Sequence, residues 1–288
     1  MDEKLRQTKR EQLRRIWSDA SVIPDAAHWS LLTGGRTNLI WRVDMQDAPP
    51  LVCKLFIPNT ATPLFANDGT REALALRALS GSRMAPELVA FQDSTLGETM
   101  VYQHIDGHPW NGDVTAAAQA MARLHARTLP VGLPELTVTP ASLIADGHGM
   151  SPSGLTPPPP VPQALPDAHR VFLHGDFVPG NIIVTSDGLR LIDWQCPAAG
   201  DSSADIAMFL SPAMQMLYGH RPLSKNEIAR FLSDYLHASQ DARAIARYHA
   251  LAPLYHWRMV AYCHWKSARG DQDYARAASL ELDALEQA

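Results

Sequence analysis

The chain lacks the features that would set it apart from ordinary globular proteins. Among its 288 residues only three are cysteine, Cys53, Cys196 and Cys263, and no CxxC pair occurs. Neither a zinc ribbon nor a disulfide framework is therefore indicated, and we expect free thiols in a reducing cytoplasm. No stretch reaches the roughly 18 apolar residues that a membrane span needs, and the charged N-terminal residues have no apolar core of the signal-peptide type. We expect a cytoplasmic protein without membrane insertion.

A basic excess is also missing. The chain has 25 Lys and Arg against 30 Asp and Glu, a formal net charge of −5, so nothing predicts a nucleic acid partner. Residues 2–18 are predicted to form a basic amphipathic helix. It would be either a surface helix packed on the first domain or a contact for a membrane or partner. Composition says nothing about oligomeric state.

The pattern of predicted strands and helices divides the chain after residue 106. Before it, apolar runs at 28–57, 87–92 and 98–105 predict strands around a helix at 70–79, a small α+β unit. After it, helices are predicted at 113–127 and through most of the chain from 225 onward. Between these helical parts, prolines crowd residues 129–168 and predict a long surface loop with one short helix. Whether that loop closes over a site is left open.

Residues 171–194, VFLHGDFVPGNIIVTSDGLRLIDW, place polar side chains at the ends of apolar runs. Asp176 and Asn181 bracket a loop, and Asp193 ends the hairpin that follows. Buried carboxylates are costly unless they are paired, hydrogen-bonded or metal-bound, so we expect the three side chains to converge. Mg²⁺ prefers such oxygen ligands, and one carboxylate could accept the proton of a substrate hydroxyl.

The HGD-x4-N loop, followed by an apolar strand that ends in Asp, resembles the catalytic loop of kinases. Gly175 stands where protein kinases usually carry Arg, and IDW replaces DFG. The chain is therefore most similar to the aminoglycoside phosphotransferase and choline kinase superfamily. GDSSADIA from residue 200 and LHA at 124–126 resemble further segments of that family. Lys54 resembles its phosphate-binding lysine, and Glu72 resembles the acid that pairs with it.

The resemblance implies a two-lobed, protein-kinase-like α+β fold. The N-lobe, 1–106, would be a small antiparallel sheet with one helix, and the C-lobe, 107–288, would be mainly helical. ATP and Mg²⁺ would bind between them. Asp176 would orient and deprotonate the acceptor hydroxyl, while Asn181 and Asp193 would hold the metal. The implied nucleotide contacts are Thr33, Gly34, Gly35, Thr37, Asn38, Lys54, Glu72, Gln103, His104 and Ile105.

Substrate choice is expected to lie late in the chain, where residues 246–266 are dense in aromatic side chains. Such rings could cage a quaternary ammonium, or they could be helix-packing core. Glu281, Asp283 and Glu286 could contribute to an acidic pocket for a polycationic aminoglycoside, but they also suit an exposed helix face. The candidate substrate residues are Trp194, Asp201, Tyr255, Trp257 and Trp265.

The expected activity is ATP- and Mg²⁺-dependent phosphorylation of a small-molecule alcohol. A choline-like or ethanolamine-like amino alcohol is the first choice of acceptor, and an aminoglycoside, thiamine or a sugar-like alcohol remains an alternative. A catalytically inactive, nucleotide-binding regulatory protein is the alternative from another class. A protein kinase is disfavoured because no APE motif follows IDW.

Overall fold

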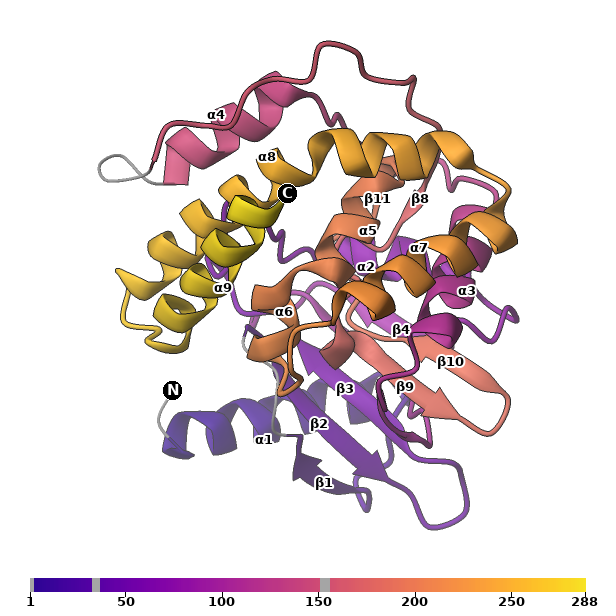
Figure 1. Ribbon diagram of the computed structural model, residues 1–288. Helices are drawn as coiled ribbons and strands as arrows, with labels where there is room; N and C mark the ends of the chain where they lie inside the picture. Colours follow the sequence, from indigo (N-terminus) through magenta and orange to yellow (C-terminus); the bar gives the residue numbers. More distant parts are fainter. Residues whose placement is uncertain (1–2, 33–36, 151–155) are drawn as a thin grey trace.

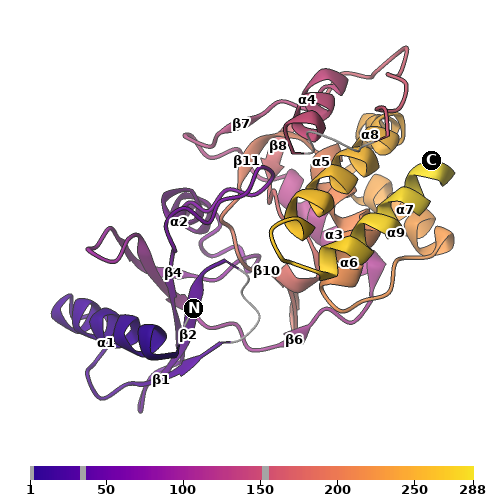
Figure 2. The same ribbon diagram turned by 90° about the vertical axis from the view of Figure 1, so that its left-hand side faces the viewer.

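A five-stranded antiparallel sheet forms one of two lobes, and helices dominate the other (Figure 1, Figure 2). The structure is a computed structural model that describes residues 3–32, 37–150 and 156–288. The predicted α+β fold, with an antiparallel sheet and a helical region, is confirmed. Within the described ranges, no helix is long and apolar enough to cross a membrane.

The N-lobe sheet has the strand order β1-β2-β3-β5-β4. Its strands are β1 (His28–Leu31), β2 (Leu39–Asp44), β3 (Leu51–Leu55), β4 (Leu88–Gln92) and β5 (Thr99–Gln103). Two helices accompany them, α1 (Glu3–Asp19) and α2 (Gly69–Ala78). The Asp68 side chain caps α2 by accepting a hydrogen bond from the Arg71 N–H, and the Ala- and Leu-rich sequence that follows favours the helix.

The two faces of the sheet pack differently because side chains alternate along each strand. Leu13 and Trp17 of α1 pack with Trp41 and Cys53 on one face, so the basic N-terminal helix is a surface helix of this lobe. On the other face Val52 joins the core that contains α2. Lys54 lies on the same face as Val52, which directs its side chain toward α2 and the second lobe.

The chain enters the second lobe after β5. The next strand, β6 (His108–Pro109), pairs with β9 (Ile182–Thr185), which also pairs with β10 (Gly188–Leu191). This β9–β10 hairpin was predicted. A separate sheet joins β7 (Glu135–Leu136), β11 (Ala198–Asp201) and β8 (Arg170–Leu173). β11 was not predicted, because its sequence AAGD lacks the β-branched and aromatic residues that mark strands.

Helices surround these small sheets (Figure 1). They are α3 (Val114–His125), α4 (Pro140–Met150), α5 (Ser203–Leu210), α6 (Pro212–Leu217), α7 (Lys225–Ser239), α8 (Ala242–Ser267) and α9 (Asp273–Gln287), with a 3₁₀ turn at Pro179–Asn181. The short helix expected in the proline-rich region is α4, which packs on α8. The packing is close, because a Cβ at Gly147 would lie 2.0 Å from the ring of Trp257.

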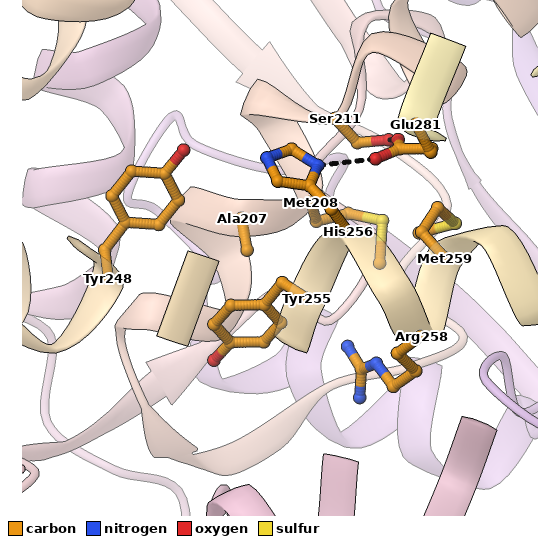
Figure 3. Close-up of a pocket in the computed structure, with 9 residues that line it drawn as sticks. All are labelled: Ala207, Met208, Ser211, Tyr248, Tyr255, His256, Arg258, Met259 and Glu281. Carbon is orange, nitrogen blue, oxygen red and sulfur yellow. Dashed lines mark hydrogen bonds and ion pairs between the residues drawn. The ribbon is translucent and has the colours of Figure 1, made fainter. Parts of the chain in front are cut away.

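A buried carboxylate joins the last helix to two others (Figure 3). Glu281 of α9 is fully buried and accepts hydrogen bonds from the Ser211 hydroxyl and, at 3.1 Å, from the Ala213 N–H. Its other oxygen lies 2.6 Å from Nδ1 of His256 on α8. Since Ser211 is the N-cap of α6, the carboxylate fixes α9 against the start of α6 and the middle of α8.

Replacing Glu281 by alanine should lower the free energy of unfolding by about 2–4 kcal/mol, because buried donors lose their acceptor. Urea denaturation measures this change. Glu286→Ala, at an exposed position of the same helix, is the control and should change stability by less than about 0.5 kcal/mol. Equal effects of the two substitutions would contradict the structural role of Glu281.

Candidate active site

A cavity of about 590 Å³ lies between the lobes, with walls from both. This volume is within the usual range of about 300–1,000 Å³ for small-molecule sites. Eight of the residues predicted from the sequence line it, namely Thr37, Lys54, Gln103, His104, Ile105, Asp176, Asn181 and Asp193. Thr33, Gly34 and Gly35 lie outside the described residues.

Lys54 of β3 crosses from the sheet to the second lobe. Its Nζ lies 2.6 Å from a carboxylate oxygen of Glu72 on α2 and 2.5 Å from one of Asp193. The lysine is only 1% exposed. Burial alone would lower its pKa, but the two carboxylates hold the pKa above its ordinary value, so the ammonium is charged. Glu72 does not reach the cavity wall and acts by holding Lys54.

The Asp176 carboxylate lies at the floor of the cavity, where it is 5% exposed. The Asn181 amide nitrogen donates to the backbone oxygen of Asp176 at 2.9 Å and to the Asp176 carboxylate at 3.0 Å. Burial, and then the nearby Asp193 charge, raise the pKa of Asp176 to about 8. A carboxyl with a pKa near neutral pH can both take up and release a proton.

Asp205, the last acid of GDSSAD, binds the backbone of the HGD loop on its buried side. Its carboxylate accepts hydrogen bonds from the backbone N–H groups of His174 at 2.8 Å and Gly175 at 2.9 Å. Nε2 of His125 lies 3.2 Å away. Burial would raise the pKa of Asp205, but these hydrogen bonds and the two histidines keep it below its ordinary value. The sequence marked this segment as family-like without predicting Asp205 as a site residue.

Two backbone positions of the site adopt left-handed conformations. Gly175 has φ +77°, and a Cβ there would lie 1.9 Å from the backbone oxygen of Cys196. This steric limit explains why HGD has glycine where protein kinases usually carry arginine. Asp193 has φ +63°, a conformation uncommon for residues other than glycine and often found at functional sites.

Asn38 does not line the cavity, which differs from its predicted nucleotide contact. Its amide nitrogen donates to Asn67 at 2.8 Å and to the Gln195 side-chain oxygen at 3.0 Å. Its oxygen accepts from the Ile57 N–H at 3.0 Å. The side chain is therefore used to brace the segment after β3 and to connect it with the second lobe.

The residues present fit a magnesium ion that arrives with a nucleotide. In the described ranges no three His, Cys, Asp or Glu side chains form a metal site on their own. Asp193 offers a carboxylate, and Asn181 offers its amide oxygen because its nitrogen is committed to Asp176. Mg²⁺ typically binds one or two protein oxygens together with water and substrate phosphates, which this donor set matches.

Most of the predicted substrate residues are packed away from the cavity, so that part of the prediction was wrong. Trp194 is fully buried and donates to the Leu191 oxygen at 2.8 Å. Trp257 is fully buried beneath α4. Asp201 forms a buried ion pair with Arg247 at 2.6 Å. Aromatic side chains can be equally frequent in a helix-packing core and in a binding wall. Their frequency in the sequence therefore did not distinguish the two.

Tyr255 and Trp265 do not line the large cavity either. Tyr255 borders a separate cavity of about 10 Å³ (Figure 3), which is at most large enough for one water molecule. Its hydroxyl lies 2.8 Å from that of Ser203. Trp265 stacks on Tyr262 and under Arg269, one layer behind the wall.

The part of the wall near α8 and α9 contains aromatic residues that were not among the candidate substrate residues, although Tyr262 lies in the aromatic-rich stretch 246–266. They are Phe65 before α2, Tyr218 after α6, Tyr262 on α8 and Tyr274 on α9, with Lys266 beside them. Tyr262 and Lys266 are four residues apart and share one helix face, a spacing that could have identified them. Phe65 and Tyr218 gave no signal, because each is isolated in sequence.

Comparisons with known proteins agree with this geometry. Residues 158–254 match the model of a family described as "Phosphotransferase enzyme family". Among curated proteins, no sequence matches the chain.

Three solved structures illustrate the shared fold. A choline/ethanolamine kinase family protein from Mesorhizobium loti is 15% identical, with a TM-score of 0.68 over 96% of this chain and 93% of that one. Ethanolamine kinase from Plasmodium vivax is 14% identical, with a TM-score of 0.67 over 95% and 87%. A spectinomycin phosphotransferase, solved with ADP and spectinomycin, is 12% identical, with a TM-score of 0.58 over 95% and 93%.

The shared fold confirms the two-lobed, protein-kinase-like architecture, and the family match confirms the predicted resemblance to phosphotransferases of this superfamily. The chain therefore shares the fold of small-molecule kinases, and its residues 158–254 match a phosphotransferase family.

Replacing Asp205 by asparagine should destabilise the protein by about 1.5–3 kcal/mol at pH 7, because a charged acceptor of several hydrogen bonds is lost. A carboxyl with a lowered folded-state pKa stabilises above its unfolded pKa, near 3.8, and this contribution disappears as pH falls through the folded value. The difference from wild type should therefore shrink below about pH 4. Urea denaturation at pH 7, 5 and 3.5 measures it, and a difference independent of pH would refute this role.

Proposed function

We propose that the protein is a small-molecule kinase that transfers a phosphoryl group from ATP, with Mg²⁺, to the hydroxyl of a small alcohol. The observation that carries the proposal is the convergence of Lys54, Asp176, Asn181 and Asp193 on one cavity between the lobes. We also place the lobe boundary at 106/107, where the chain passes from β5 to β6. Three free thiols fit a reducing cytoplasm.

Phosphoryl transfer requires mainly positioning and charge neutralisation, and the described side chains suit both tasks. Lys54 would exchange its contact with Asp193 for the phosphates while Glu72 keeps the ammonium in place. Mg²⁺, when bound to Asp193 and Asn181, would supply further neutralisation. The hinge residues Gln103–Ile105 line the same cavity and are placed to contact the base.

Asp176 would act on the acceptor. Its carboxylate can accept a hydrogen bond from the substrate hydroxyl and orient the oxygen toward the γ-phosphate. It would take up the proton as the new P–O bond forms and the bond from the γ-phosphorus to the β–γ bridging oxygen breaks, which releases ADP. Asn181 keeps the carboxylate oriented, and Asp205 keeps the backbone of the loop fixed beneath it. Orienting the acceptor is an established source of rate in such reactions.

The proposed acceptor is one of several small alcohols. Solved structures of choline and ethanolamine kinases share this fold, which keeps an amino alcohol as one candidate. The acidic pocket suggested for an aminoglycoside is not supported, because Glu281 is buried under α6 while Asp283 and Glu286 lie on an exposed helix face. Thiamine and sugar-like alcohols stay in the set to be tested.

Substitution of the proposed base separates an enzyme from an inactive nucleotide-binding protein. Asp176→Asn should lower kcat by about 10²–10⁴-fold while ATP binding persists, because only proton transfer and hydroxyl orientation are lost. ADP release over a panel of alcohols measures turnover, and thermal shift with an ATP analogue measures binding. If wild type and variant both bind Mg-ATP yet phosphorylate no alcohol, the enzyme proposal fails.

Asp193→Ala should abolish Mg²⁺-dependent turnover and leave the fold largely intact. Asp187→Ala, in the exposed turn of the same hairpin, is the matched control and should retain wild-type turnover. Steady-state rates across a magnesium titration test both variants. Normal turnover by Asp193→Ala would overturn the metal-site assignment.

A further inference from the structure

The segment between β3 and α2, residues 57–67, leaves the N-lobe sheet and reaches the second lobe; we name it the strap. Four of its residues, Thr60, Thr62, Phe65 and Ala66, line the large cavity. The strap is thus an N-lobe contribution to the part of the cavity that faces α8 and α9.

Direct contacts hold the strap against the C-lobe. The Phe65 ring lies edge-on to Tyr262 of α8, with ring centroids 5.3 Å apart. The Tyr262 hydroxyl donates to the Thr62 hydroxyl at 3.3 Å, and the Cys196 thiol donates to the Ala66 oxygen at 3.3 Å. Leu64 packs into the same C-lobe core beside Phe65. The strap therefore belongs to both lobes.

Hydrogen bonds within the N-lobe fix the shape of the strap. The Asn67 amide nitrogen donates to the Ile57 oxygen at 3.0 Å, to Thr60 Oγ1 at 2.7 Å and to Asn38 Oδ1 at 3.0 Å. The Phe65 N–H donates to Thr62 Oγ1 at 3.1 Å. Such a prebuilt wall loses little conformational entropy when a ligand binds.

The opposite wall consists of aromatic rings close to the reacting carboxylate. Tyr262 and Tyr274 have ring centroids 5.9 Å apart. Tyr218 lies against the catalytic loop, because a Cβ at Gly180 would be 2.0 Å from its ring. Tyr262 and the proposed base Asp176 line the same cavity.

The charges of this wall disfavour a polycation. Of the described residues that line the cavity, only Asp176 and Asp193 are carboxylates, and both belong to the catalytic centre. The Lys266 ammonium lies 5.1 Å from the centroid of the Tyr274 ring, so a cation already occupies that aromatic face. Aromatic side chains in the wall instead suit stacking or edge contacts with a ring.

We infer that the acceptor is an alcohol that carries a flat aromatic ring, packed against the surface that Phe65 of the strap forms with the tyrosines of the C-lobe. Phe65 is then a specificity-determining residue contributed by the N-lobe. This inference rests on the proposed phosphotransferase function and names the substrate class of the same site.

The test compares acceptors and one pair of strap variants in the full chain. The panel contains ring alcohols (2-phenylethanol, pyridoxine and thiamine), acyclic amino alcohols (choline and ethanolamine) and spectinomycin, each with Mg-ATP. Wild type should show at least tenfold higher kcat/KM for a ring alcohol than for the others. Phe65→Ala should raise the KM for that alcohol at least tenfold and leave the KM for ATP within twofold. Phe65→Tyr, which keeps the ring, should show the wild-type KM for that alcohol.

Leu64→Ala is the matched control, because Leu64 packs in the same core but does not line the cavity. It should leave the acceptor KM unchanged, and thermal denaturation verifies that both variants fold. Preference for choline, ethanolamine or spectinomycin would overturn the inference while the kinase function stands, as would an unchanged acceptor KM in Phe65→Ala. Absence of transfer to any compound by wild type that binds the nucleotide would overturn both.

Discussion

The buried ion pairs of Lys54 are the interaction on which the site depends. One ammonium contacts Glu72 of the N-lobe helix and Asp193 of the C-lobe hairpin at 2.6 and 2.5 Å. An unpaired buried charge would cost several kcal/mol, so Glu72 stabilises the buried ammonium within the N-lobe, and Asp193 connects it to the second lobe. The same ammonium is the group that a nucleotide's phosphates need. The Lys54–Asp193 contact between the lobes is therefore also the contact that bound phosphates would take over.

The rest of the site follows from fixing one loop around this point. Gly175 can make the sharp turn because it has no Cβ, and Asp205 binds the turn's N–H groups from the buried side. Asp176 is thereby presented at the cavity with its orientation set by Asn181. Farther from the chemistry, the strap and three tyrosines complete the cavity.

The catalytic centre could be predicted from the sequence because its residues occur in short, ordered motifs. The spacing of Asp176, Asn181 and Asp193, together with the resemblance of the segment around Lys54 to a kinase superfamily, led to the prediction of one shared site, and all four residues line one cavity. The proposed acceptor wall was not predicted, because Phe65, Tyr218 and the pair Tyr262 and Tyr274 come from segments far apart in sequence that meet only in the fold. Trp194 and Trp257 were wrongly favoured, since a buried ring and a ligand-binding ring look alike in sequence.

The most direct measurement is calorimetric titration of AMP-PNP into wild type and Asp193→Asn, each with Mg²⁺ and with EDTA. If Asp193 passes from Lys54 to the metal when the nucleotide binds, Mg²⁺ should strengthen wild-type binding at least tenfold, which is about 1.4 kcal/mol. The variant should show little of this gain. Equal affinities with and without Mg²⁺ in wild type, or an equal gain in the variant, would contradict the proposed exchange of partners at Lys54.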